Sequence, residues 1–86
     1  MNRFDELYKY IDENYNIVEV TDENNLGTRY IDFMINNNKY TASYNKKSNS
    51  FCVTDADCNE FIYKGFSFVA LKLALEQEED KTKVVA

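Results

Sequence analysis

The segment Asp55-Ala56-Asp57-Cys58-Asn59 has the residue types that could bind a metal ion, because it matches the start of a calcium-binding loop. Carboxylates and an amide at alternate positions supply the oxygen ligands that Ca²⁺ prefers. Such a loop also needs glycine at its sixth position and a bidentate glutamate at its twelfth. This chain has Glu60 and Phe66 at those positions. The segment is therefore predicted to form an acidic turn and not a calcium site.

Cys52 and Cys58 are the only cysteines, and the chain contains no histidine. The absence of histidine excludes a zinc site built on imidazole and any histidine general base or catalytic triad. The spacing of the two cysteines matches no common metal motif, and a thiolate nucleophile at Cys58 would lack an imidazole to activate it. We expect two buried or half-buried thiols in a reducing compartment, and no metal or other cofactor.

An enzymatic function is not expected. Gly27 and Gly65 are the only glycines, so the chain has no glycine-rich phosphate-binding loop. No pair of carboxylates is marked out for acid–base work, and so small a core can hardly build a deep pocket around one. A role in binding is predicted instead.

Carboxylates gather in loops and at the ends of the predicted elements. Their negative charge has two interpretations: ordinary solubility, or a surface that imitates nucleic-acid phosphates and occupies a cationic groove on another protein. The second interpretation makes these carboxylates the candidate partner-binding residues: Asp12, Glu13, Asp22, Glu23, Asp55, Asp57, Glu60, Glu78, Glu79 and Asp80.

Length and charge limit the class of protein further. With 86 residues the chain is one domain, and 15 acidic against 10 basic residues give a net charge of −5. This charge disfavours direct nucleic-acid binding, which needs clustered Lys and Arg. No apolar run approaches the roughly 18 residues of a membrane span, and the N-terminus has no signal-peptide pattern. We therefore expect a cytoplasmic protein.

Two amphipathic helices are predicted, one at each end of the chain. Asn2 is a suitable N-cap for a helix that ends near Asn14, and Ser67 is a suitable N-cap for a helix from 68 to about 79. The first helix has an apolar stripe of Phe4, Leu7, Tyr8, Ile11 and Tyr15. The second has a broader stripe of Phe68, Leu71, Ala74 and Leu75, widened by Val69, Ala70 and Leu73. So broad a stripe packs across a sheet or into a dimer, with Phe68, Leu71 and Leu75 as the candidate dimer interface.

Between the helices, alternating apolar and polar residues predict antiparallel strands at 16–21, 28–35, 39–44 and 50–54. Residues 60–64 favour a further short strand, with a helical turn as the alternative. The expected inward-facing side chains are Ile31, Phe33, Ile35, Tyr40, Ala42, Tyr44, Phe51 and Val53. The prediction is a single α+β domain over residues 1–80. It is an α-β-β-β(-β)-α antiparallel meander with both helices on one face, followed by a frayed tail at 81–86.

A resemblance covers about the first 50 residues. Its first features are Met1-Asn2 and Asp5 with a short amphipathic helix, and then Tyr15 with a β-branched strand. They are followed by the polar turn Thr21-Asp22-x-Asn24 and by Ile35-Asn36-Asn37 in a hairpin that leads to Tyr40 and Ser43. In these features the chain resembles small anti-CRISPR proteins of phages and prophages, which inhibit the Cas nuclease of type II systems. The resemblance implies that acidic side chains imitate DNA in the groove where the nuclease reads its target-flanking motif, which Arg and Lys line.

The chain departs from that family's pattern at several positions. Asn14, Asn38 and Lys39 stand where the family has acidic residues, and the family's acidic segment after the second helix is absent. The resemblance thus implies a DNA-mimicking strategy, but it does not assign those positions. Lys64-Gly65-Phe66-Ser67-Phe68 is similar to a segment of a phage inhibitor of uracil-DNA glycosylase, which implies the same strategy against another target.

Two functions follow as hypotheses. In the first, the chain is a phage or mobile-element inhibitor in the bacterial host cytoplasm, and its carboxylates block a host nucleic-acid enzyme such as a Cas nuclease complex. In the second, it is a non-enzymatic structural or oligomerisation module that associates through its apolar second helix, for example as a homodimer.

Overall fold

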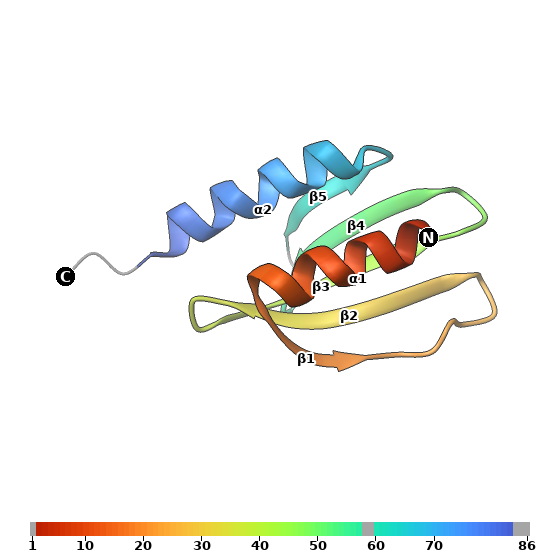
Figure 1. Ribbon diagram of the computed structural model, residues 1–86, viewed down its shortest axis with the longest axis horizontal. Helices are drawn as coiled ribbons and strands as arrows, with labels where there is room; N and C mark the ends of the chain where they lie inside the picture. Colours follow the sequence, from red (N-terminus) through yellow and green to blue (C-terminus); the bar gives the residue numbers. More distant parts are fainter. Residues whose placement is uncertain (1, 58–59, 84–86) are drawn as a thin grey trace.

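A five-stranded antiparallel sheet forms the centre of the fold, and both helices pack on one of its faces (Figure 1). The computed structural model describes residues 2–57 and 60–83. The strand order β1-β2-β3-β4-β5 follows the sequence, which confirms the predicted α+β meander and makes the fifth strand part of the sheet. The elements are α1 Arg3–Asn14, β1 Asn16–Val20, β2 Thr28–Ile35, β3 Asn38–Asn45, β4 Ser50–Asp55, β5 Phe61–Gly65 and α2 Phe68–Thr82.

Both helices begin at the predicted caps. The Asn2 side chain accepts a hydrogen bond from the Asp5 backbone N–H at 2.8 Å, and the Ser67 hydroxyl accepts one from the Ala70 N–H at 3.1 Å. These side chains satisfy backbone donors that have no partner within the helix. The helix α2 continues to Thr82, beyond the predicted end near Glu79. The remaining tail residues 84–86 lie outside the described residues.

The hairpin between β2 and β3 turns on Asn36 and Asn37, whose φ angles are 53° and 92°. Asparagine tolerates this left-handed region better than most residues, as the sequence predicted. Residues 61–65 form a strand and not a helical turn, and they pair with β4 through a register shift after Val53. Cys58 and Asn59, which belong to the predicted acidic turn before this strand, lie outside the described residues.

The core lies between the sheet and the two helices. One correction concerns α1: Tyr8 is exposed, whereas Tyr10 packs against the core. The reason is that α2 lies beside α1, where the rings of Tyr10 and Phe68 meet edge to face with their centroids 6.0 Å apart. The inward-facing strand residues are buried as predicted, except that Tyr44 is half-buried. The buried residues are Phe4, Leu7, Ile11, Ile31, Phe33, Ile35, Tyr40, Ala42, Phe51, Val53, Leu71 and Leu75.

Candidate functional site

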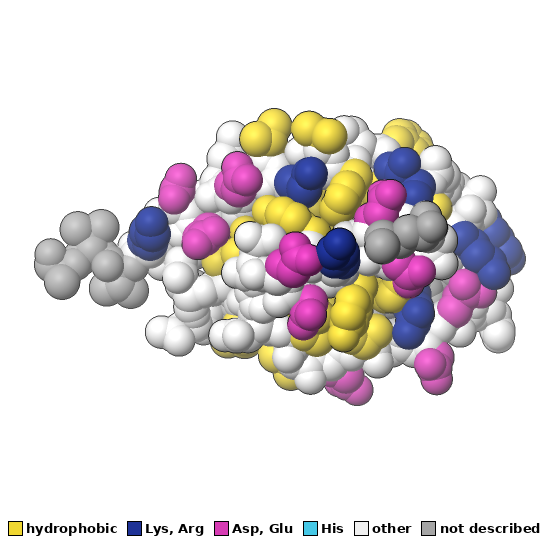
Figure 2. Space-filling view, viewed as in Figure 1, with side chains coloured by type: hydrophobic (Ala, Val, Ile, Leu, Met, Phe, Trp, Pro, Cys, Tyr) yellow, Lys and Arg dark blue, Asp and Glu magenta, His cyan; other side chains and the backbone are white. Residues whose placement is uncertain are grey.

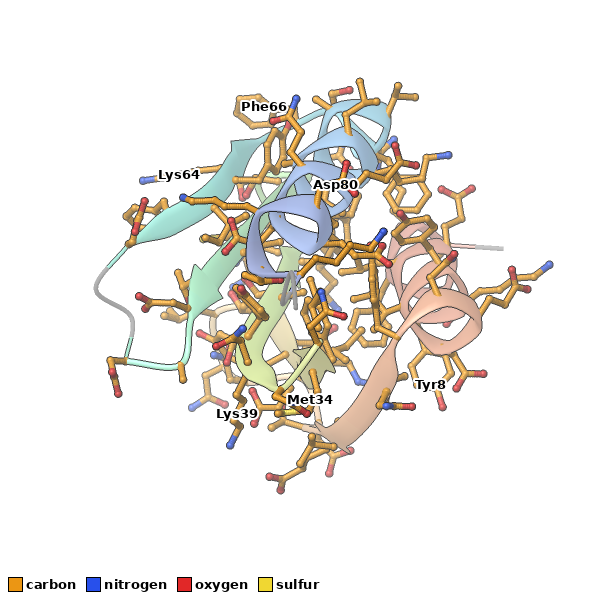
Figure 3. All side chains as sticks on the ribbon, turned by 90° about the vertical axis from the view of Figure 1, so that its left-hand side faces the viewer. Tyr8, Met34, Lys39, Lys64, Phe66 and Asp80 are labelled. Atoms are coloured by element: carbon orange, nitrogen blue, oxygen red, sulfur yellow. The ribbon has the colours of Figure 1, made fainter. Side chains whose placement is uncertain are left out.

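Most of the predicted partner-binding carboxylates come together at one end of the molecule, here called the acidic end. It is formed by the last turn of α1, the connection between β4 and β5, and the C-terminal part of α2. Figure 3 faces this end, with Asp80 of α2 near its centre. The carboxylates of the acidic end are Asp12, Glu13, Asp55, Asp57, Glu60, Glu78, Glu79 and Asp80.

The direction of the elements explains this convergence. Each strand of the meander runs opposite to its neighbour, so successive connections lie at alternate ends of the sheet. The end of α1, the β2–β3 turn and the β4–β5 connection share one end (Figure 1). Because β5 runs away from that end, α2 returns to it. Three acidic segments that are distant in sequence therefore lie at one end of the molecule, where residues of α1 and of the β4–β5 connection each share a hollow with α2.

Two hollows flank the C-terminal part of α2 at the acidic end. The larger, of about 550 Å³, is lined by Asp12, Glu13 and Glu79 together with the Asn36-Asn37 turn. The smaller, of about 250 Å³, is lined by the carboxylates of Asp55, Asp57, Glu60 and Glu78. Lys39 is the cation among them. Neighbouring glutamates of α2 thus face different hollows, and each hollow presents carboxylates from separate elements.

Two tyrosines, the buried Tyr40 and the half-buried Tyr15, hold the glutamates of α2 in place. The Tyr40 hydroxyl donates a hydrogen bond to Glu78 Oε2 at 2.7 Å, and the Tyr15 hydroxyl donates to Glu79 Oε1 at 3.4 Å. Burial raises the pKa of Tyr40, and the hydrogen bond and charge of Glu78 raise it further. Burial, the neighbouring Tyr10 and Glu79 likewise raise the pKa of Tyr15. Both hydroxyls therefore remain donors at neutral pH, and they orient carboxylates that stay accessible to a partner.

The β2–β3 turn also anchors the end of α2. The Asn36 Nδ2 group donates hydrogen bonds to the Glu79 carbonyl at 3.0 Å and to the Thr82 hydroxyl at 3.2 Å. The Thr82 hydroxyl in turn donates to the Glu78 carbonyl at 2.9 Å. These contacts satisfy carbonyls that the helix end leaves unpaired, which explains why α2 runs past the predicted boundary. Asn36, Tyr15 and Tyr40 were not predicted as site residues, because a local role in a turn or in the core accounts for each of them in the sequence.

Asp22 and Glu23 are not part of the acidic end. They belong to the β1–β2 loop at the opposite end of the sheet, where the Glu23 carboxylate lies 2.8 Å from Lys46 Nζ. Figure 2 shows Lys and Arg side chains at this opposite, right-hand end of the molecule. The charge of −5 is therefore distributed unevenly along the molecule.

The ion pairs of the acidic end leave its carboxylates accessible. Lys9 Nζ is 4.0 Å from Glu13, and Lys83 Nζ is 4.0 Å from Asp80, with all four side chains more than half exposed. Pairs this long and this exposed contribute little to stability. A cationic partner group can displace them at small cost, so the arrangement is suited to binding basic side chains.

The apolar face of α2 differs from the predicted dimer interface. Leu71 and Leu75 are fully buried against the sheet, and Phe68 stacks on Phe51 with ring centroids 5.7 Å apart. Leu71 and Leu75 are therefore core residues that cannot also contact a second protein, whereas Phe68 is half-buried. The exposed apolar residues are Phe66, Val69 and Leu73, which are 68%, 63% and 54% exposed. Hydrophobic side chains over α2 are visible along the upper edge of Figure 2.

Burial of Tyr40 and its contact with Glu78 make the free energy of unfolding depend on pH in the alkaline range. The folded-state pKa of Tyr40 lies above the value of about 10 in an unfolded chain. Above pH 10 the unfolded state therefore binds fewer protons, and the free energy of unfolding falls by up to about 1.4 kcal/mol per pH unit for this group. Urea unfolding between pH 9 and 12 measures the slope, which Tyr40→Phe should reduce. Equal slopes in the two proteins would contradict this assignment.

Within residues 2–57 and 60–83, no group of three or more Cys, Asp and Glu side chains is arranged to hold a metal ion. In the same ranges no helix has both the length and the apolar character needed to cross a membrane. No protein-family model, curated protein or solved structure matches this chain. Its function is therefore inferred from the acidic end itself.

Proposed function

We propose that this protein is a phage or mobile-element inhibitor that binds the basic nucleic-acid groove of a host enzyme through its acidic end. The supporting observation is the convergence of carboxylates from α1, the β4–β5 connection and α2 on one surface. The resemblance of the N-terminal half to anti-CRISPR proteins makes a type II Cas nuclease the first target to test. The inhibitor acts without a cofactor and without catalysis, in the host cytoplasm.

The physical basis is electrostatic complementarity. A groove that binds DNA is lined with Arg and Lys, and a concentrated negative surface accelerates association with it. Carboxylates that are already oriented lose less conformational entropy on binding than free side chains do. The hydrogen bonds from Tyr15 and Tyr40 provide this orientation for Glu79 and Glu78.

The experiment measures binding to a guide-RNA-loaded type II Cas nuclease by biolayer interferometry, at several salt concentrations and with competing target DNA. We expect the association rate to fall as salt rises, because exposed charges are screened. Target duplex that carries the flanking motif should compete, whereas duplex without the motif should compete weakly. Binding that is indifferent to both salt and DNA would contradict the proposal.

Self-association through the exposed face of α2 is the second candidate function. The exposed Val69 and Leu73 lie on the side of the helix opposite the buried Leu71 and Leu75, and the exposed Phe66 precedes the helix. An antiparallel crossing of two copies near Val69 would place each acidic end away from the other, whereas a parallel pairing would bring like charges together. Three side chains bury less than the roughly 800 Å² per partner of a stable interface, so the dimer should be weak.

Leu73→Lys tests this second function. The side chain is exposed, so the substitution should leave the fold intact and abolish a dimer that forms at high micromolar concentration. Light scattering measures the molecular mass. The matched control is Gln77→Lys, which introduces the same charge on the next turn of the same helix face. A parent protein that stays monomeric up to millimolar concentration would exclude self-association.

A further inference from the structure

A small basic hollow lies at the end of the molecule opposite the acidic end. Here the inner face of the sheet extends beyond the first turn of α1, and Arg29 and Tyr44 face each other across β2 and β3. The hollow measures about 190 Å³, and Phe4, Lys46 and Glu23 also line it. It therefore combines two cations with aromatic walls in a space large enough for a small ligand.

Arg29 is held in a defined orientation at this hollow. Its Nε donates a hydrogen bond to the Thr21 carbonyl at 2.8 Å, and its guanidinium carbon lies 4.4 Å from the centre of the Phe4 ring. Within the part of the chain that the structure describes, its terminal nitrogens have no hydrogen-bond partner. A guanidinium fixed in this way presents its planar fork of donors without further loss of side-chain entropy.

Lys46 supplies a second positive charge that can be redirected to a ligand. Its Nζ is 2.8 Å from the Glu23 carboxylate, with side chains that are 59% and 45% exposed. An ion pair of such exposure is weak, so an oxyanion in the hollow can compete with Glu23 for the ammonium group. Glu23 is thus the group that the ligand must displace.

We propose that this hollow binds a phosphate group, with the Arg29 fork on two of its oxygens and Lys46 on a third. A bidentate guanidinium contact matches the geometry of phosphate. The volume admits a phosphate and part of a small organic group, which can lie against the half-buried Tyr44. The phosphate can therefore be inorganic or the ester of a small molecule such as a nucleotide. This site is separate from the acidic end, because it lies at the opposite end of the molecule and shares no lining residue with it.

The test is an NMR titration of the full chain with inorganic phosphate, adenosine monophosphate and adenosine, at an ionic strength held constant with chloride. Saturable shifts of the Arg29 side-chain signal and of the Gly27 amide are expected with both phosphates and not with adenosine. Tighter binding of the nucleotide than of inorganic phosphate would identify an ester as the ligand, whereas equal binding would identify the phosphate alone.

Variants assign the binding to these residues. Lys46→Gln should weaken phosphate binding about threefold to tenfold, and Arg29→Lys, which keeps the charge but loses the fork, roughly tenfold. Glu23→Gln should strengthen binding about threefold, because it frees Lys46. Glu23 and Lys46 are exposed, so these two variants keep the fold and test the site even if Arg29→Lys unfolds. Unchanged affinity in both, or displacement by chloride at equal ionic strength, would overturn the proposal.

Discussion

Replacing Glu78 and Glu79 with glutamine and Asp80 with asparagine is expected to weaken binding to the basic partner by about a hundredfold. Removing three charges that face a cationic groove, at about 1 kcal/mol each, accounts for a loss of this size. Most of it should appear in the association rate, and the salt dependence should become shallower. Glutamine at 78 and 79 keeps a side-chain oxygen that can accept the tyrosine hydrogen bonds, so the helix end should stay in place.

The matched control neutralises the same kind of charge at the opposite end. Asp22→Asn with Glu23→Gln removes carboxylates that the acidic end does not contain, and binding to the Cas nuclease should change less than twofold. Interferometry on both variants, with circular dichroism as a check of the fold, separates a local site from the effect of net charge. An equal loss in the two variants would show that only net charge matters.

Leu75→Ala is expected to lower the free energy of unfolding by about 2–5 kcal/mol. Its side chain is fully buried between α2 and the sheet, and its removal leaves a cavity that the neighbouring core residues cannot fill. Because an 86-residue domain has a stability of only about 5–10 kcal/mol, this loss is a large fraction of the total and should lower the midpoint of unfolding markedly. Urea unfolding followed by circular dichroism measures the change.

Leu73→Ala is the control, since it removes the same atoms from the same helix. Leu73 is exposed, so its truncation should change stability by less than about 0.5 kcal/mol. The two substitutions together also test which face of α2 packs against the sheet. A larger loss for Leu73→Ala than for Leu75→Ala would require α2 to pack with its other face on the sheet.

Local sequence signals predicted most of the fold. Alternation in 28–35 and 39–44 identified the central strands, and Asn36-Asn37 identified the turn between them because few residues tolerate positive φ. Asn2 and Ser67 identified the helix starts through their capping side chains. Residues 60–64 were harder to assign, because a short apolar run without strict alternation fits a strand or a helical turn until a partner strand is present.

The candidate site was predicted only as a set of acidic residues. The exposed and buried faces of α2 could not be told apart, because a helix that is apolar on most sides does not show which stripe meets the sheet. For the same reason Leu71 and Leu75 were assigned to a dimer interface, although they form the core. The number of strands could have predicted where the second helix ends. With an odd number of antiparallel strands between two helices, the second helix starts at the far end of the sheet and runs back to the end where the first helix finishes.

Residue types and contacts within a few positions were enough to predict most of the secondary structure, the net charge of −5 and the absence of histidine chemistry. Which carboxylates lie at the same end of the molecule depends on the tertiary structure. Asp12, Asp57 and Glu79 are distant along the chain, and alternating strands and the return of α2 bring their segments to one end. Asp22 and Glu23 have the same chemistry but lie beyond β1, which carries the chain to the other end.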